Sequence, residues 1–149
     1  MTFDNLVKLF YSWGHYLHIK EYSEFREYFE KMLSKNRVMI IQENGFIKAI
    51  VMFFLTDDYE RFLYKPLWEI PEGENLEGKY IVIDKMACQK WDFSIRRLLQ
   101  KVIEEKFNVL EGHYYHAPLG PHVIIKRRSH QHVQHTNLVG QGIGNMFGS

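Results

Sequence analysis

An apolar, strand-like run over residues 79–89 leads through a short connection into an amphipathic helix over 94–107, and this junction is the first candidate for chemistry. The helix has one apolar face because its apolar residues recur at intervals of three and four: Ile95, Leu98, Leu99, Val102 and Ile103. The first-turn N–H groups of a helix lack intrahelical partners, and the helix dipole is positive there. Many folds hold an anionic ligand at a junction of this kind.

Histidines are the second group of residues suited to chemistry. Six of the eight lie in the last third of the chain: His113, His116, His122, His130, His132 and His135. On a strand His130 and His132 share a face that His135 does not, and no cysteine cluster or H-E-x-x-H pattern accompanies them. These features favour a structural or pH-responsive polar surface over a metal site. We therefore predict no bound metal.

Cysteine content and charge limit the other classes of chemistry. Cys88 is the only cysteine, which excludes an intrachain disulfide, fits a reducing compartment and favours a half-buried strand residue over a nucleophile. With 19 Lys and Arg against 18 Asp and Glu, the 149-residue chain has a net charge of +1, so its charge predicts no general affinity for nucleic acid. The basic run 126–128 is weak support for such an affinity.

The start of the chain has no basic segment followed by an apolar one, and no apolar run approaches the roughly 20 residues of a membrane span. We therefore expect neither a signal peptide nor a transmembrane helix. A cytoplasmic location is consistent with this composition.

Two helices are predicted to precede the first strands. Residues 3–13 have helical spacing, with Thr2 or Asp4 available as N-cap. A second helix begins after Ser23, which is its predicted cap, and ends near residue 35. Its aromatic stripe favours core packing over a ligand pocket.

A β-hairpin follows. Two β-rich runs, 38–43 and 46–55, are joined by Asn44-Gly45, a pair that favours a two-residue turn because both residues tolerate positive φ. The second run is apolar on both faces from residue 50 onward, which places it inside the sheet.

The next segment, 56–78, has no periodicity and is rich in acids and aromatic rings. It is predicted to be an ordered connection that folds back on the domain. A solvated loop with a few anchoring rings is favoured over a receptor for a cationic amine. After the amphipathic helix, residues 109–116 are predicted to be a strand, 121–129 a short helix with Pro121 at its first position, and 130–138 a last strand.

The C-terminal tail, 139–149, has four glycines and cannot build a core of its own. We expect it to contact a protein partner or another copy of the chain. The residues expected to make that contact are Gly140, Gly142, Ile143, Met146 and Phe147.

This order of elements over residues 1–138 resembles the GNAT N-acetyltransferase superfamily. The resemblance implies an α/β (α+β) fold: one domain with a mixed, mostly antiparallel sheet flanked by helices, followed by the tail. In that family the central strand leads to a Gln/Arg-x-x-Gly-x-Gly/Ala turn whose amides bind the pyrophosphate of acetyl-CoA. The matching residues are Gln89, Asp92 and Ser94 within Gln89-Lys-Trp-Asp-Phe-Ser94.

Asp92 stands where the family has the first glycine of that turn. At about 4 Å and an effective dielectric of about 20, a like charge there costs roughly 4 kcal/mol, which removes much of a micromolar affinity. Asp92 and Ser94 also suit helix N-caps, which need no ligand. We therefore expect a degenerate pyrophosphate loop and no cofactor.

If the chain is an enzyme, the resemblance implies Asp84 as the base and Tyr114 or Tyr115 as the acid, because amine acetylation needs one proton removed and one returned. Our leading expectation is a non-catalytic structural or interaction protein, of the GNAT-like kind encoded among virion genes of some short-tailed phages. The alternative is an acetyl-CoA-dependent N-acetyltransferase acting on an amine.

Overall fold

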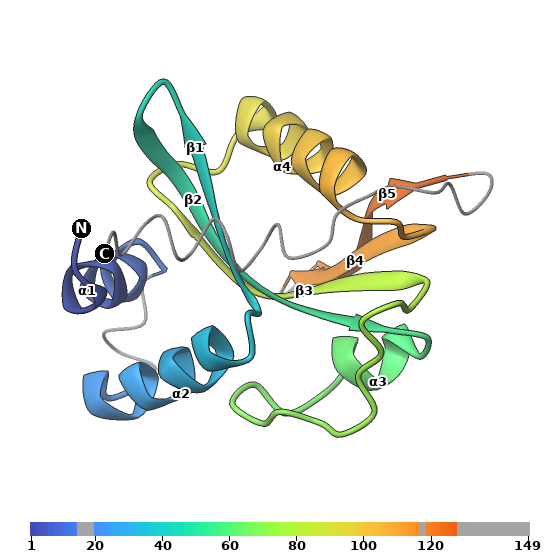
Figure 1. Cartoon of the computed structure of the whole chain (residues 1–149), viewed down its shortest axis with the longest axis horizontal. Coiled ribbons are helices and arrows are strands. Elements are labelled where there is room, and N and C mark those ends of the chain that lie inside the picture. The colour runs from blue at the N-terminus through green and yellow to red at the C-terminus, as the bar shows by residue number, and fades with distance from the viewer. Residues whose placement is uncertain (15–19, 117–118, 128–149) are drawn as a thin grey trace. The chain divides into compact units, whose positions relative to one another are not determined.

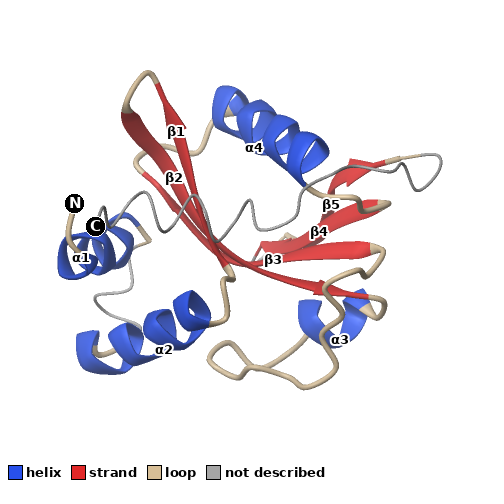
Figure 2. Ribbon diagram, viewed as in Figure 1, coloured by secondary structure: helices blue, strands red, loops and turns tan. Residues whose placement is uncertain are grey.

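The computed structural model describes residues 1–14, 20–116 and 119–127, and within them it has a mixed α+β fold (Figure 1). The helices are α1 (Phe3–Trp13), α2 (Tyr22–Ser34), α3 (Tyr59–Leu63) and α4 (Phe93–Lys106). The strands are β1 (Val38–Glu43), β2 (Phe46–Thr56), β3 (Tyr80–Cys88), β4 (Glu111–His116) and β5 (Gly120–Lys126). They form one sheet in the order β1-β2-β3-β4-β5, which is mostly antiparallel (Figure 2).

The described residues fall into two compact units, each treated separately below. The first contains residues 1–14, 20–52 and 86–91, and the second contains 53–85, 92–116 and 119–127. Strands β2 and β3 contribute residues to both units.

In the first unit, α1 and α2 pack through aromatic side chains. Phe10 meets Phe25 and Phe29 at ring-centroid distances of 5.4 and 5.8 Å, and all three are fully buried. The predicted first helix is confirmed, as is Thr2 as its cap, because Thr2 Oγ1 accepts from the Asn5 N–H at 3.2 Å. The second helix starts at Tyr22, so Ser23 is not its cap. Its aromatic stripe is core, as predicted.

The predicted hairpin is confirmed. Asn44 and Gly45 have φ values of 54° and 82°, and β1 pairs antiparallel with β2 across them. A bulge between Ile41 and Gln42 shifts the register. Residues 49–56 of β2 are all buried, as expected for a strand that lies between β1 and β3.

In the second unit, β3 and β4 are parallel neighbours joined through α4. The predicted amphipathic helix is confirmed within one residue at each end. Its buried residues are Leu99 and Ile103, and Gln100 Nε2 donates to the Ile124 carbonyl at 2.7 Å. Figure 1 shows α3 and α4 on opposite sides of the strands of this unit.

The short helix predicted from Pro121 is wrong over the described residues, which form β5 and pair antiparallel with β4. The β-branched run Val123-Ile124-Ile125 suits a strand, and Gly120 enters it with a φ of 96°. The last strand predicted at 130–138 lies outside the described residues.

The segment 56–78 is ordered and packs back on its own unit, as predicted. The Asn75 N–H donates to the Leu55 carbonyl at 2.9 Å. Asp57 Oδ1 accepts from the Lys79 N–H at 3.1 Å, and Asp57 Oδ2 accepts from Asn75 Nδ2 at 2.7 Å. The segment also contains α3, which five residues are too few to reveal by periodicity.

Candidate functional site

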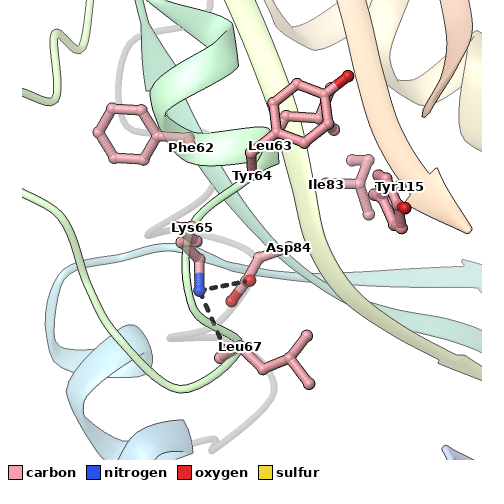
Figure 3. Close-up of a pocket in the computed structure, with 8 residues that line it drawn as sticks. All are labelled: Phe62, Leu63, Tyr64, Lys65, Leu67, Ile83, Asp84 and Tyr115. Atoms are coloured by element: carbon pink, nitrogen blue, oxygen red, sulfur yellow. Dashed lines mark hydrogen bonds and ion pairs between the residues drawn. The ribbon is translucent and has the colours of Figure 1, made fainter. Parts of the chain in front are cut away.

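A cavity of about 300 Å³ lies in the second unit, beside α3, the middle of β3 and the end of β4 (Figure 3). Its lining residues come from α3, the segment that follows α3, β3 and β4: Phe62, Leu63, Tyr64, Lys65, Leu67, Ile83, Asp84 and Tyr115. Two of the three residues expected to act in catalysis, Asp84 and Tyr115, therefore line the same cavity.

One side of the cavity is ionic. Asp84 Oδ1 lies 2.9 Å from Lys65 Nζ and 3.2 Å from Lys85 Nζ. The side chains of Lys65, Asp84 and Lys85 are only 3%, 5% and 4% exposed. A carboxylate this deeply buried needs compensating charge and hydrogen bonds, and the two ammonium groups supply both. We call these three residues the Lys-Asp-Lys cluster.

The two lysines also hold the segment that follows α3. Lys65 Nζ donates to the carbonyls of Pro66 and Leu67 at 3.2 and 3.1 Å. Figure 3 shows the bond to Leu67. Lys85 Nζ donates to the same Leu67 carbonyl and lies 4.5 Å from the centroid of the Trp68 ring. The cluster therefore fastens the segment 65–68 to β3.

The environment of Lys85 changes its pKa. Burial lowers its pKa from 10.5 to about 8, because the ammonium form loses its hydration. The Asp84 carboxylate opposes this shift, and the charge of Lys65 adds to it. A fraction of Lys85 is therefore a neutral amine in mildly alkaline solution.

The mouth of the cavity is apolar and exposed. Tyr64, Leu67 and Tyr115 are 58%, 65% and 50% exposed. The rings of Tyr64 and Tyr115 meet edge to face, with centroids 5.9 Å apart. Exposed aromatic side chains beside a cavity with apolar walls and a few polar groups are typical of a binding site.

Tyr114 is not part of this cavity. Successive strand residues point to opposite faces, and Tyr114 faces α4, where its hydroxyl accepts from Arg96 Nη1 at 2.8 Å. Its ring also stacks on His122 at 5.1 Å. The structure thus brings Asp84 together with Tyr115 and separates it from Tyr114.

The residues expected to form the pyrophosphate loop lie at the start of α4. Asp92 is the N-cap, as predicted, and its Oδ1 accepts from the Ile95 N–H at 3.0 Å. Ser94 is not the cap, because α4 begins at Phe93 and Ser94 lies within its first turn. Gln89 is exposed directly after β3.

The described histidines lie apart from the cavity. His113 is buried, stacks on Tyr59 at 3.9 Å, and places Nε2 2.8 Å from Glu111 Oε1. Within residues 1–14, 20–116 and 119–127, no group of three His, Cys, Asp or Glu side chains is arranged to hold a metal ion. His130, His132 and His135 lie outside those residues.

The tail residues Gly140, Gly142, Ile143, Met146 and Phe147 also lie outside the described part of the chain. Cys88 is half-buried at the end of β3, as predicted. In the part of the chain that the structure describes, no helix has the length and apolar character needed to cross a membrane.

Lys65, Lys85 and Trp68 are the site residues that the sequence did not indicate. A signal was present, since Asp84-Lys85 places two charges inside an otherwise apolar strand, where charged side chains are rarely buried unless they are paired.

Comparison of the sequence with protein-family models, with curated proteins and with solved structures finds no match.

Proposed function

We propose that this protein is a non-catalytic, GNAT-like α+β domain that acts by contacting other molecules. The observation that carries this proposal is the cap of α4. The Asp92 carboxylate occupies the N-terminus of the helix and accepts from the Ile95 N–H at 3.0 Å. An acetyl-CoA pyrophosphate approaching these amides would meet a like charge, at a cost of roughly 4 kcal/mol at about 4 Å.

The surroundings of Asp84 support the same proposal. A general base must take a proton from its substrate, and a carboxylate that already accepts from two ammonium groups is poorly suited to do so. Asp84 meets this description, with Lys65 at 2.9 Å and Lys85 at 3.2 Å. Its contacts suit a structural role better than proton transfer.

The partner is proposed from the sequence. The glycine-rich tail, 139–149, and the basic, histidine-rich segment before it are the regions proposed to bind a protein or a second copy of the chain. Such a role would match the GNAT-like virion proteins of short-tailed phages, with the virion or the cytoplasm as the location. Nucleic acid is a weaker candidate, since the net charge is +1.

Calorimetric titration with acetyl-CoA tests the proposal. We expect no binding by the natural protein and partial recovery in Asp92→Gly, which removes the carboxylate and opens the amides. The matched control is Asp58→Gly, because Asp58 caps α3 in the same way. Micromolar binding by the natural protein would overturn the proposal. Absence of binding in both proteins would contradict the role given to Asp92 and leave the proposal supported by the surroundings of Asp84 alone.

The alternative is an acetyl-CoA-dependent N-acetyltransferase acting on an amine. It is favoured by the shared position of Asp84 and Tyr115 on one cavity. Turnover of acetyl-CoA with a panel of amines tests it. In an enzyme of this kind, Tyr115→Phe should lower kcat roughly 10²-fold or more, whereas Tyr114→Phe on the opposite face should not.

A further inference from the structure

The cavity beside α3 has the size and lining of a small-molecule site. Its volume of about 300 Å³ is at the lower end of the range for such sites, roughly 300–1,000 Å³. Phe62, Leu63 and Ile83 give it apolar walls, while Lys65 and Asp84 place polar groups at a few positions. This combination of apolar surface and a few oriented polar groups is what fixes a ligand in one pose.

We propose that this cavity binds a small carboxylate whose other end is a flat apolar group. The exposed side chains at the mouth of the cavity indicate the apolar end of the ligand. The exposed rings of Tyr64 and Tyr115 stand edge to face 5.9 Å apart, beside the exposed Leu67. A flat ring laid against this pair would cover aromatic surface that now faces water.

The carboxylate follows from Lys65. Its side chain is 3% exposed, and its ammonium donates to two neutral carbonyls, those of Pro66 and Leu67, as well as contacting Asp84. A carboxylate is a stronger acceptor than a neutral carbonyl, with bonds roughly twice as strong. A ligand anion that replaces one carbonyl therefore improves the bonding of Lys65. Its repulsion by Asp84 is offset by the ammonium groups of Lys65 and Lys85, which give the cluster a net positive charge.

The composition of the Lys-Asp-Lys cluster favours an anion over a cation. A ligand ammonium would approach Asp84 beside two ammonium groups, at 2.9 and 3.2 Å from that carboxylate. This ligand proposal does not depend on the proposed non-catalytic function, because it is argued from the lining of the cavity and not from the Asp92 cap.

Three probes with the same body and different heads test the ligand class: 3-phenylpropionate, 3-phenylpropanamide and 3-phenylpropylamine. We expect the carboxylate to bind the full-length protein at least tenfold more tightly than the amide and the amine, as measured by calorimetry. Equal binding by all three, tightest binding by the amine, or no binding by the carboxylate would each overturn the proposal.

Substitutions locate the binding. Lys65→Met should abolish the tenfold preference for the carboxylate, whereas Lys101→Met, at an exposed lysine on α4, should preserve it. Because Lys65→Met also alters a buried cluster, Tyr115→Ala at the exposed mouth provides a second test. This substitution should lower the affinity for all three probes by a similar factor of at least three. Unchanged affinity in Tyr115→Ala would place the probe elsewhere and contradict the assignment.

Discussion

Asp84 and Lys65 form a 2.9 Å ion pair in which neither side chain is more than 5% exposed. Lys85, the next residue along β3, contacts the same carboxylate from 3.2 Å. The pair joins a central strand to the segment that follows α3, a connection whose sequence shows no periodicity. This cluster supports the proposed function because it occupies Asp84, and the proposed ligand depends on it because Lys65 and Asp84 line the cavity.

Removing the charge of Asp84 should destabilise the protein strongly. Asp84→Asn leaves two buried ammonium groups without their carboxylate, and breaking a buried ion pair in this way costs roughly 3–5 kcal/mol. Urea unfolding measures the difference. The control Asp58→Asn, at the exposed cap of α3, should change the free energy of unfolding by less than about 1 kcal/mol, because Asn caps nearly as well as Asp. Equal effects in both variants would contradict burial of the cluster.

Stability should rise with pH through the titration of Lys85. Its pKa is about 8 in the folded protein and 10.5 when unshifted, so between these values the unfolded chain binds more protons. The penalty for burying the ammonium is complete below pH 8 and fades as pH increases. The gain amounts to at most about 3 kcal/mol by pH 10.5.

The free energy of unfolding of the natural protein and of Lys85→Met, measured from pH 7 to 10, isolates this contribution. The difference between the two proteins should shift in favour of the natural protein as pH rises. A difference independent of pH would mean that Lys85 titrates normally.

Gly78 should not tolerate a side chain. A Cβ at this position would lie 2.5 Å from the backbone carbonyl carbon and oxygen of Thr56, so the connection between β2 and β3 must shift to accommodate alanine. We expect Gly78→Ala to cost at least roughly 2 kcal/mol in thermal or urea unfolding. The control Gly45→Ala introduces no contact within 4 Å and strains only a positive φ of 82°, at about 1 kcal/mol. A larger loss of stability in Gly45→Ala than in Gly78→Ala would show that the connection between β2 and β3 can shift at little cost.

Deleting residues 139–149 should weaken association and leave the fold intact. The tail cannot form a core of its own, and the proposed partner contacts lie within it. Sedimentation velocity measures association, and circular dichroism with thermal unfolding measures the fold. Loss of folding in the truncated chain would contradict an interaction role for the tail.

Much of the fold was predictable because its signals are local. The spacing of Phe3 to Trp13, the Asn44-Gly45 pair and the apolar face of α4 each specify an element within a short window. The wrong prediction of a helix at Pro121 arose because the local sequence fits two structures. Pro121 suits the first turn of a helix as well as the start of a strand, and the pairing with β4 decides between them.

The site was only partly predictable because it depends on long-range pairing. The parallel register that matches Ile83 with Tyr114 brings Asp84 near Tyr115, and no sequence pattern specifies that register. The opposite faces of Tyr114 and Tyr115 follow from strand alternation, once the strand is known. Lys65 belongs to a segment without periodicity, so its contact with Asp84 had no signal.

The most direct test of the cluster is an NMR titration of the Lys85 side chain, in the natural protein and in Asp84→Asn. We predict a midpoint near pH 8, since burial lowers the pKa of Lys85. The midpoint should fall further in Asp84→Asn, because the carboxylate that favours the ammonium is lost. A midpoint near 10.5 in the natural protein, unchanged by Asp84→Asn, would mean that Lys85 faces water and that Asp84 is not held by two lysines.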